Sequence, residues 1–341
     1  MFRFFIIALL FVQLSASAQI NVSPQYKSKS KYVAGSPGLN TLYDAVDMSF
    51  DEALNFLEGS TTYFIVPKGV SEADQTELTT KLNAVWTLTD KVELISMADF
   101  SATDYRGQKA NFISMVGNFV PVNKSYAFSP YSPPYKNYKP KNTITTHNRL
   151  SFWAFDDEKR FRSFGGIELT YNVYSWYKKY KRDLKKMHVD FVNNAQYEGN
   201  WFNGYIINGL QLIQEKIKSK KAVGGDYRLA QQVQLSLLKE KTLYIPNYVL
   251  EHRRGYTKEK DLLKSYHHPV QVISKEELNT KIMSSSEPVY YLIGTSSNDT
   301  EFVSVFNSKT GAIVYHDYIG NSIKLKGKHL EKLARVIDKY K

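Results

Sequence analysis

EFVSVFNSKTGAIVYHDYI, residues 301–319, contains two apolar, aromatic-rich runs separated by a short polar segment. The runs Glu301–Phe306 and Ala312–Tyr318 have the β-branched and aromatic composition that is typical of strands. The segment Asn307–Gly311 ends in glycine, the residue that most easily adopts the φ > 0 that hairpin turns require. The stretch therefore predicts an antiparallel β-hairpin.

Strands and helices alternate on both sides of this hairpin. The strands expected before it are Thr242–Pro246, Pro269–Ile273 and Pro288–Ile293. The expected helices are Lys258–Tyr266, a short helix opened by the capping box of Ser274 and Glu277, and Gly327–Tyr340. The last helix places four apolar residues on one face, as expected of a helix that packs on a sheet: Leu330, Leu333, Ala334 and Ile337.

The first half of the chain shows the same order of elements. A capping box of Ser49 and Glu52 opens a short helix that ends near Glu58. The expected strands are Thr61–Pro67, Lys91–Met97, Asn111–Val116, Asn148–Phe155 and Gly166–Tyr171, and the expected helices are Ser71–Leu88 and Tyr174–Met187. The repeated order predicts a structural duplication. The residue identities do not repeat, however, and a single α/β domain shows a similar alternation.

We therefore expect an α+β protein with two small sheet-and-helix units joined by a helical segment. In that segment one helix carries the apolar stripe Ile206, Leu210, Ile213 and Ile217, and a second helix is expected over Tyr227–Lys239. The expected boundaries are 1–18 for a signal peptide, 19–59 for a flexible leader and short helix, 60–173 for the first α/β unit, 174–241 for the helical connector, and 242–341 for the second α/β unit with its C-terminal helix.

The first residues predict export. Met1–Ala18 combines Arg3, the apolar run Phe4–Leu14 and a small-residue end, which is the layout of a secretory signal peptide cleaved before Gln19. The alternative is an N-terminal membrane anchor, but the apolar run is short for a membrane span. We expect a secreted or periplasmic chain with no transmembrane segment after cleavage. The absence of cysteine excludes disulfides, thiolate metal sites and a lipid-modified cysteine.

The net charge of +12 favours acidic partners such as an anionic polymer or surface. Basic and aromatic residues alternate in YSWYKKYKRDLKKM, residues 174–187. The candidate anion-binding residues there are Lys178, Lys179, Lys181, Arg182, Lys185 and Lys186, and Lys216–Lys221 forms a second basic cluster. The alternative is that the aromatic side chains pack on their own sheet and the lysines form a solvated face. No nucleic-acid partner is expected.

Motifs for a catalytic nucleophile, a dinucleotide or a P-loop lack their required sequence context, so no cofactor is expected. The candidate catalytic residues are Asp156, Asp157 and Glu158, because paired carboxylates can hydrolyse glycosidic bonds; a solvated hairpin turn is the alternative.

No histidine pair has the i, i+4 spacing of a helical metal site, so no metal site is expected. His267 and His268 are neighbours, and on an extended segment they would point to opposite faces.

The C-terminal half resembles cell-envelope α/β domains such as those of the curli secretion protein CsgG, the penicillin-binding-protein activator LpoB and the N-terminal part of TolB. The resemblance is carried by the hairpin 301–319, with Lys309, Thr310 and Gly311 at its turn, and by the preceding strand Pro288–Gly294. It implies an envelope binding or scaffolding domain and transfers no functional residue.

We expect an exported, non-enzymatic interaction, scaffold or ligand-binding protein of the bacterial envelope, with another envelope protein or an anionic polymer as partner. The alternative is a secreted hydrolase that acts on an acidic polymer such as a polysaccharide.

Overall fold

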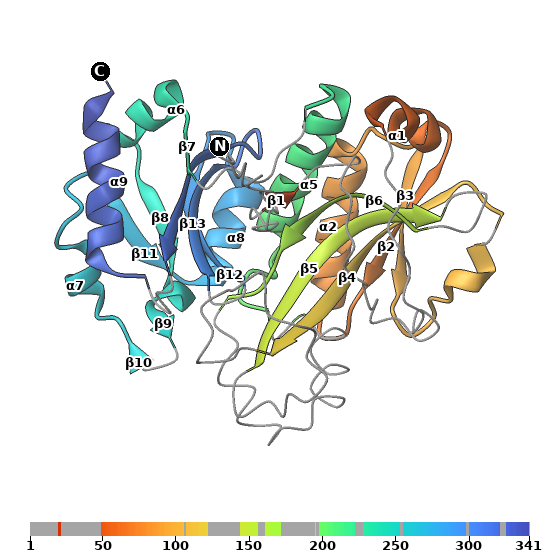
Figure 1. Cartoon of the computed structure of the whole chain (residues 1–341), viewed down its shortest axis with the longest axis horizontal. Coiled ribbons are helices and arrows are strands. Elements are labelled where there is room, and N and C mark those ends of the chain that lie inside the picture. Colours follow the sequence, from red (N-terminus) through yellow and green to blue (C-terminus); the bar gives the residue numbers. More distant parts are fainter. Residues whose placement is uncertain are drawn as a thin grey trace, which may run out of the picture.

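The computed structural model describes residues 20–21, 49–105, 107–121, 144–155, 161–171, 195, 198–221, 228–252, 255–297, 300–320 and 325–340. Within these ranges the chain forms an α+β structure with two mixed sheets, each accompanied by helices (Figure 1). The expected fold class is confirmed.

The first sheet contains five main strands and one short edge strand. The main strands are β2 (Thr61–Val66), β3 (Lys91–Ser96), β4 (Ala110–Pro121), β5 (Ile144–Phe155) and β6 (Phe161–Glu168). Their spatial order is β6-β5-β4-β2-β3, in which β2 runs parallel to β3 and β4 and the other neighbours are antiparallel. The short strand β1 (Ile20–Asn21) pairs antiparallel with β6 at the edge.

The second sheet repeats this topology. Its main strands are β8 (Leu243–Pro246), β11 (Val270–Ile273), β12 (Tyr290–Ser297), β13 (Thr300–Asn307) and β14 (Ile313–Gly320). They lie in the order β14-β13-β12-β8-β11. Strand β8, like β2 in the first sheet, runs parallel to both of its neighbours, and the other pairs are antiparallel. The short strand β7 (Arg228–Ala230) pairs antiparallel with β14, as β1 does with β6. The two sheets therefore agree strand by strand, and the expected duplication holds at the level of topology.

The helices also correspond between the two units. The first unit has α1 (Phe50–Leu57), α2 (Glu72–Val85) and α5 (Asn203–Lys218), and the second has α6 (Gln232–Ser236), α7 (Glu259–Leu263) and α9 (Gly327–Lys339). Helix α5 contacts α1 and α2, just as α9 contacts α6 and α7. Helix α5, from the region expected to be a connector, thus occupies in the first unit the place that α9 occupies in the second.

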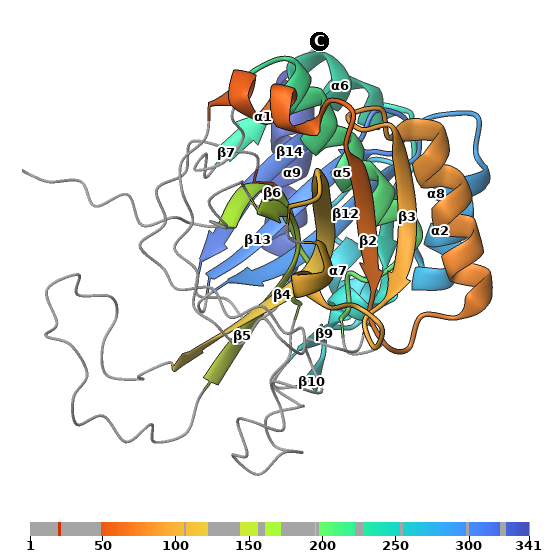
Figure 2. The same ribbon diagram turned by 90° about the vertical axis from the view of Figure 1, so that its right-hand side faces the viewer.

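Helix α5 lies between the two sheets, with α2 and α8 (Lys275–Ser284) beside it (Figures 1 and 2). Its predicted stripe Ile206, Leu210, Ile213 and Ile217 is buried in a core that also includes Phe306 and Tyr291 of the second sheet. A second core lies between the other face of that sheet and α9. The helix layer of the first unit therefore packs on the second sheet, and the two units share one hydrophobic core.

The remaining elements are short. They are η1 (Ala102–Tyr105), η3 (Leu237–Lys239), η4 (Asn247–Leu250), β9 (Glu251–His252) and β10 (Gly255–Tyr256). Among the helices in the described ranges, none has the length and apolar character needed to cross a membrane.

Local sequence signals placed most of these elements correctly. Both predicted capping boxes are formed, with Ser49 and Ser274 each accepting a hydrogen bond from the backbone N–H of the glutamate three residues later. The helix expected over 227–239 is wrong at its start, because Arg228–Ala230 instead pairs with β14. Strand β6 begins at Phe161 rather than Gly166, since its pairing with β5 continues past a bulge at Phe152 and Trp153.

The hairpin 301–319 forms as predicted, and its turn contacts the first unit. Gly311 has φ +68°, and a Cβ atom there would lie 2.2 Å from the backbone oxygen of Asn208 in α5. The Asn208 side chain donates to the Ser308 carbonyl at 2.7 Å and accepts from the Tyr291 hydroxyl at 2.8 Å. Glycine is needed at residue 311 both for its backbone conformation and for this close approach to α5.

Candidate functional site

The candidate residues from the sequence lie largely outside the described residues. This holds for Asp156, Asp157 and Glu158, and for Lys178, Lys179, Lys181, Arg182, Lys185 and Lys186. Residues 156–160 connect β5 to its antiparallel neighbour β6. The carboxylate cluster, the hydrolase alternative that rests on it, and the basic helix stay predictions.

The second basic cluster lies at the C-terminal end of α5. Lys216 pairs with Glu215 at 2.8 Å, and Lys220 pairs with Asp51 at 2.5 Å. The Lys218 ammonium donates to the Thr87 hydroxyl. Cations at a helix C-terminus also interact favourably with the helix dipole. These lysines therefore already have structural partners, and Lys221 adds an exposed charge beside them.

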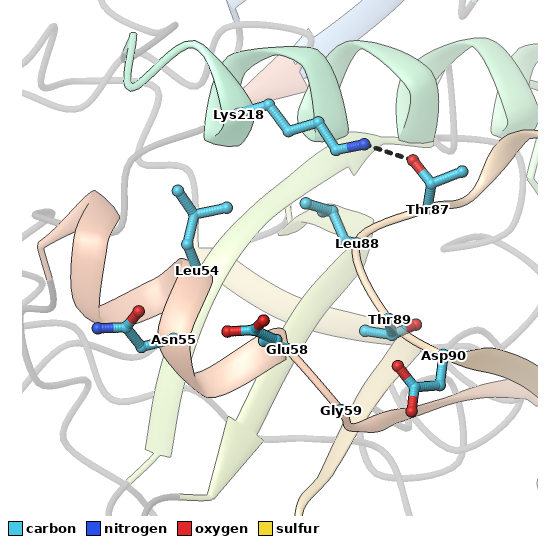
Figure 3. A pocket seen from close by; sticks show the side chains of 9 residues that line it. All are labelled: Leu54, Asn55, Glu58, Gly59, Thr87, Leu88, Thr89, Asp90 and Lys218. Atoms are coloured by element: carbon cyan, nitrogen blue, oxygen red, sulfur yellow. Dashed lines mark hydrogen bonds between the residues drawn. The ribbon is translucent and has the colours of Figure 1, made fainter.

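A hollow of about 370 Å³ opens next to this cluster (Figure 3). Three segments line it: the end of α1 with Leu54, Asn55, Glu58 and Gly59, the loop Thr87–Asp90, and Lys218 of α5. The Lys218–Thr87 hydrogen bond closes one side, and Glu58 and Asp90 place two carboxylates on the other (Figure 3). The mixed charges suit a small polar group or a polar side chain of a partner.

A cluster of buried polar residues lies where β5 and β6 approach the second unit. Glu168 at the end of β6 is 4% exposed, and Glu198, which precedes α5, is 1% exposed. The Asn148 side chain of β5 donates to one carboxyl oxygen of Glu198. The other oxygen of Glu198, Oε2, is buried and has no hydrogen-bond partner among the described residues. Neither glutamate stands out in the sequence, because carboxylates on strands and in loops are usually solvated.

Burial sets the protonation of this carboxyl pair. It raises the pKa of Glu168 to about 8, a rise that the Arg149 charge opposes and the Glu198 charge increases. Burial raises the pKa of Glu198 to about 7, although the hydrogen bond from Asn148 and the charge of Lys275 oppose the rise. Near neutral pH the pair therefore holds a proton that two solvated glutamates would have lost.

The residues that follow β6 link the two units beside this carboxyl pair. Asn200 donates to the Gly294 carbonyl of β12 at 2.9 Å and accepts from the Tyr248 hydroxyl of η4. Tyr171 donates to the Val249 carbonyl at 2.7 Å. A Cβ atom on Gly294 would lie 2.6 Å from the Tyr171 ring. The titratable pair is therefore part of a tightly packed junction, and a change in its charge would act on the contact between the units.

Strands β4 and β5 form a ribbon that extends past the rest of the first sheet. β2 pairs with β4 only over Ala110–Ile113, and β6 pairs with β5 only from Arg149 onward. The ladder between β4 and β5 continues to Pro121 and Ile144. Within the described ranges, Asn118–Pro121 and Ile144–His147 therefore pair only with each other, and both strands project from the body of the molecule (Figure 2).

The two neighbouring histidines lie differently from the expectation. His267 and His268 are in the turn between α7 and β11 rather than on an extended strand, and their ring centroids are 4.3 Å apart. Both Nε2 atoms lie 3.1 Å from the Asp338 carboxylate of α9. The prediction that the side chains point to opposite faces was wrong, because the bend at His268 turns both rings the same way.

Comparison of the chain with protein-family models, with curated proteins and with solved structures gave no match.

Proposed function

We propose that this chain is an exported, non-catalytic interaction protein of a bacterial cell envelope, which acts as a scaffold, assembly factor or ligand-binding module. The observation that carries the proposal is the β4–β5 ribbon. Over Asn118–Pro121 and Ile144–His147 each strand has one edge without a described pairing partner.

Such edges favour recognition of another chain. The N–H and C=O groups on the outer edge of a strand can pair with an added strand, and backbone pairing of this kind is a common mode of peptide recognition. Two-stranded ribbons are marginally stable alone, so a partner that adds a strand also stabilises the ribbon.

Features of the sequence support the location and the kind of partner. The layout of Met1–Ala18 favours export, and the net charge of +12 favours an acidic partner surface. The resemblance of the hairpin 301–319 to envelope domains favours binding or scaffolding over chemistry. The partner is then another envelope protein or an anionic polymer.

Export is tested by expressing the full chain in a Gram-negative host and measuring the mass of the product in the periplasmic and cytoplasmic fractions. We expect a periplasmic product that begins at Gln19. A cytoplasmic product that retains Met1 would contradict export.

The ribbon is tested by photo-crosslinking in living cells. A photoreactive amino acid at Thr145 should yield a discrete high-mass adduct, and the same group at Arg335, which is 67% exposed on α9, serves as the control. Adducts of equal yield from both positions, or from neither, would contradict recognition by the ribbon.

A further inference from the structure

We propose that His267, His268 and Asp338 form a binding site for a divalent transition-metal ion of the zinc class. Their candidate ligand atoms, two imidazole nitrogens and a carboxylate oxygen, all lie within 4.8 Å of one another. The residues come from two separate segments, the turn before β11 and the last turn of α9. An ion here would connect the C-terminal helix to the edge of the second sheet.

The spacing of the ligand atoms fits a shared ion. Zinc binds nitrogen and oxygen at about 2.0–2.2 Å, so two ligands at a tetrahedral angle are about 3.3 Å apart. The Nε2 atoms of His267 and His268 each lie 3.1 Å from a carboxylate oxygen of Asp338. One carboxylate thus meets both imidazoles at the separation of ligands on a single metal.

The surroundings of His268 give an independent indication. Its side chain is 9% exposed, and its Nε2 atom is buried without a hydrogen bond in the described structure, although Asp338 Oδ1 is only 3.1 Å away. An oxygen that accepts a hydrogen bond from an imidazole lies close to the line of the N–H bond. An oxygen that shares a metal ion with the imidazole nitrogen lies away from that line, because the ion occupies it. Asp338 Oδ1 also lies 3.2 Å from His267 Nε2, so an ion beside this oxygen would give the His268 Nε2 atom the partner that it lacks.

A buried tyrosine adjoins one of the proposed ligands. Tyr266 is 5% exposed, and its ring packs edge-on against His268 with centroids 5.5 Å apart. Its buried hydroxyl has no described hydrogen-bond partner. A second polar group without a partner therefore belongs to a residue that packs on the cluster.

The charges around the cluster are mixed, because Asp338 brings one carboxylate to the two imidazoles. The nearby Lys239 charge opposes an added cation and limits the affinity.

The ligand types select the ion. Imidazole nitrogen with carboxylate oxygen suits zinc, nickel and copper, whereas magnesium and calcium prefer oxygen ligands only. His267 and Asp338 have exposed fractions of 61% and 44%, so an ion can enter from solvent and keep water at its remaining position. We therefore expect zinc to bind more weakly here than at a closed site with four protein ligands.

Isothermal titration of the chelator-treated, desalted chain with zinc chloride tests the site, with magnesium chloride as the comparison ion. We expect one zinc ion per chain and no magnesium heat. His267→Ala should weaken zinc binding at least tenfold, and because this side chain is exposed the variant should fold. Asp338→Asn removes the charged ligand and should abolish binding. Glu331→Gln removes an exposed carboxylate from the same helix outside the cluster and should bind zinc like the parent chain.

Cobalt gives a second readout at the same site. Its visible absorption should show the strong bands of a four-coordinate ion in the parent chain and lose them in His267→Ala. Zinc in hundredfold excess over its dissociation constant should also raise the melting temperature of the parent by several degrees, and that of Asp338→Asn by none. Absent zinc heat, or equal zinc affinity in the parent and both ligand variants, would overturn the proposal.

Discussion

The two units share one strand order but use the middle hairpin of the sheet differently. In the first unit β4 and β5 are each 12 residues long and continue beyond their neighbours. In the second unit the corresponding strands β12 and β13 are each 8 residues long, and the following turn docks on α5. The β4–β5 hairpin of the first unit thus extends outward, whereas the turn between β13 and β14 of the second unit packs against α5 of the first. A duplicated topology does not imply a duplicated role.

The docking of the second unit on α5 is tested most strongly by Gly311→Ala. We expect it to lower the free energy of unfolding by about 3 kcal/mol, because the new Cβ combines an unfavourable φ with a collision against the Asn208 backbone. Urea unfolding measures the effect.

Gly59→Ala is the matched control, because Gly59 has nearly the same φ, +67°, and its added Cβ would meet only Lys109 Nζ, at 3.9 Å. It should cost about 1 kcal/mol, the conformational part alone. Equal costs at both glycines would show that the turn does not press on α5.

The carboxyl pair at the junction predicts a pH-dependent stability. Glu198 has a folded-state pKa of about 7 against an ordinary 4.5, so the folded state binds more protons than the unfolded state between these values. The contribution of Glu198 to the free energy of unfolding is fully present below about pH 4.5 and is lost as the pH rises through 7. Glu168 extends this loss of stability to about pH 8.

Glu198→Gln should therefore stabilise the chain at pH 9 by about 1–3 kcal/mol and leave it nearly unchanged at pH 4. Denaturant unfolding at both pH values checks this, with the exposed Glu276→Gln as the control. A variant whose stability follows the parent at every pH would mean that the Glu198 carboxyl titrates normally.

The contact between α5 and the second sheet can be measured as the coupling free energy between Asn208 and Tyr291. Asn208→Ala leaves the Tyr291 hydroxyl and the Ser308 carbonyl without their partner, and Tyr291→Phe removes the hydroxyl. We expect a coupling of about 1 kcal/mol in a double-mutant cycle. Simple additivity of the two substitutions would contradict a direct contribution of this hydrogen bond.

The ribbon should matter least to stability. Replacing residues 118–147 by Asn-Gly would join the register partners Gly117 and Asn148 through a two-residue hairpin turn. The melting temperature should change by only a few degrees, about 1 kcal/mol or less, since the distal residues form ladder pairs with no third described strand. Loss of cooperative unfolding would instead make the ribbon part of the core of the first unit.

The features that could be predicted from the sequence are those that depend on residues close together in the chain. Capping boxes at Ser49 and Ser274, the apolar stripe of α5 and the glycine turn at residue 311 depend on neighbours a few residues away, and the structure forms all of them. The edge strand β7 was taken for helix, because its pairing with β14 brings together residues more than 80 positions apart. The anion-binding and carboxylate candidates stay predictions.

The sequence by itself determined the fold class, the repeated order of elements and the absence of any cysteine chemistry, since composition and periodicity are local properties of the chain. Only the tertiary structure decided which polar groups meet. Glu168 and Glu198 become a coupled pair through burial, and His267 and His268 reach Asp338 through the packing of α9 beside the turn before β11. The physical reason is that desolvation and convergence of charges depend on distance in space, which residue spacing in the chain does not encode.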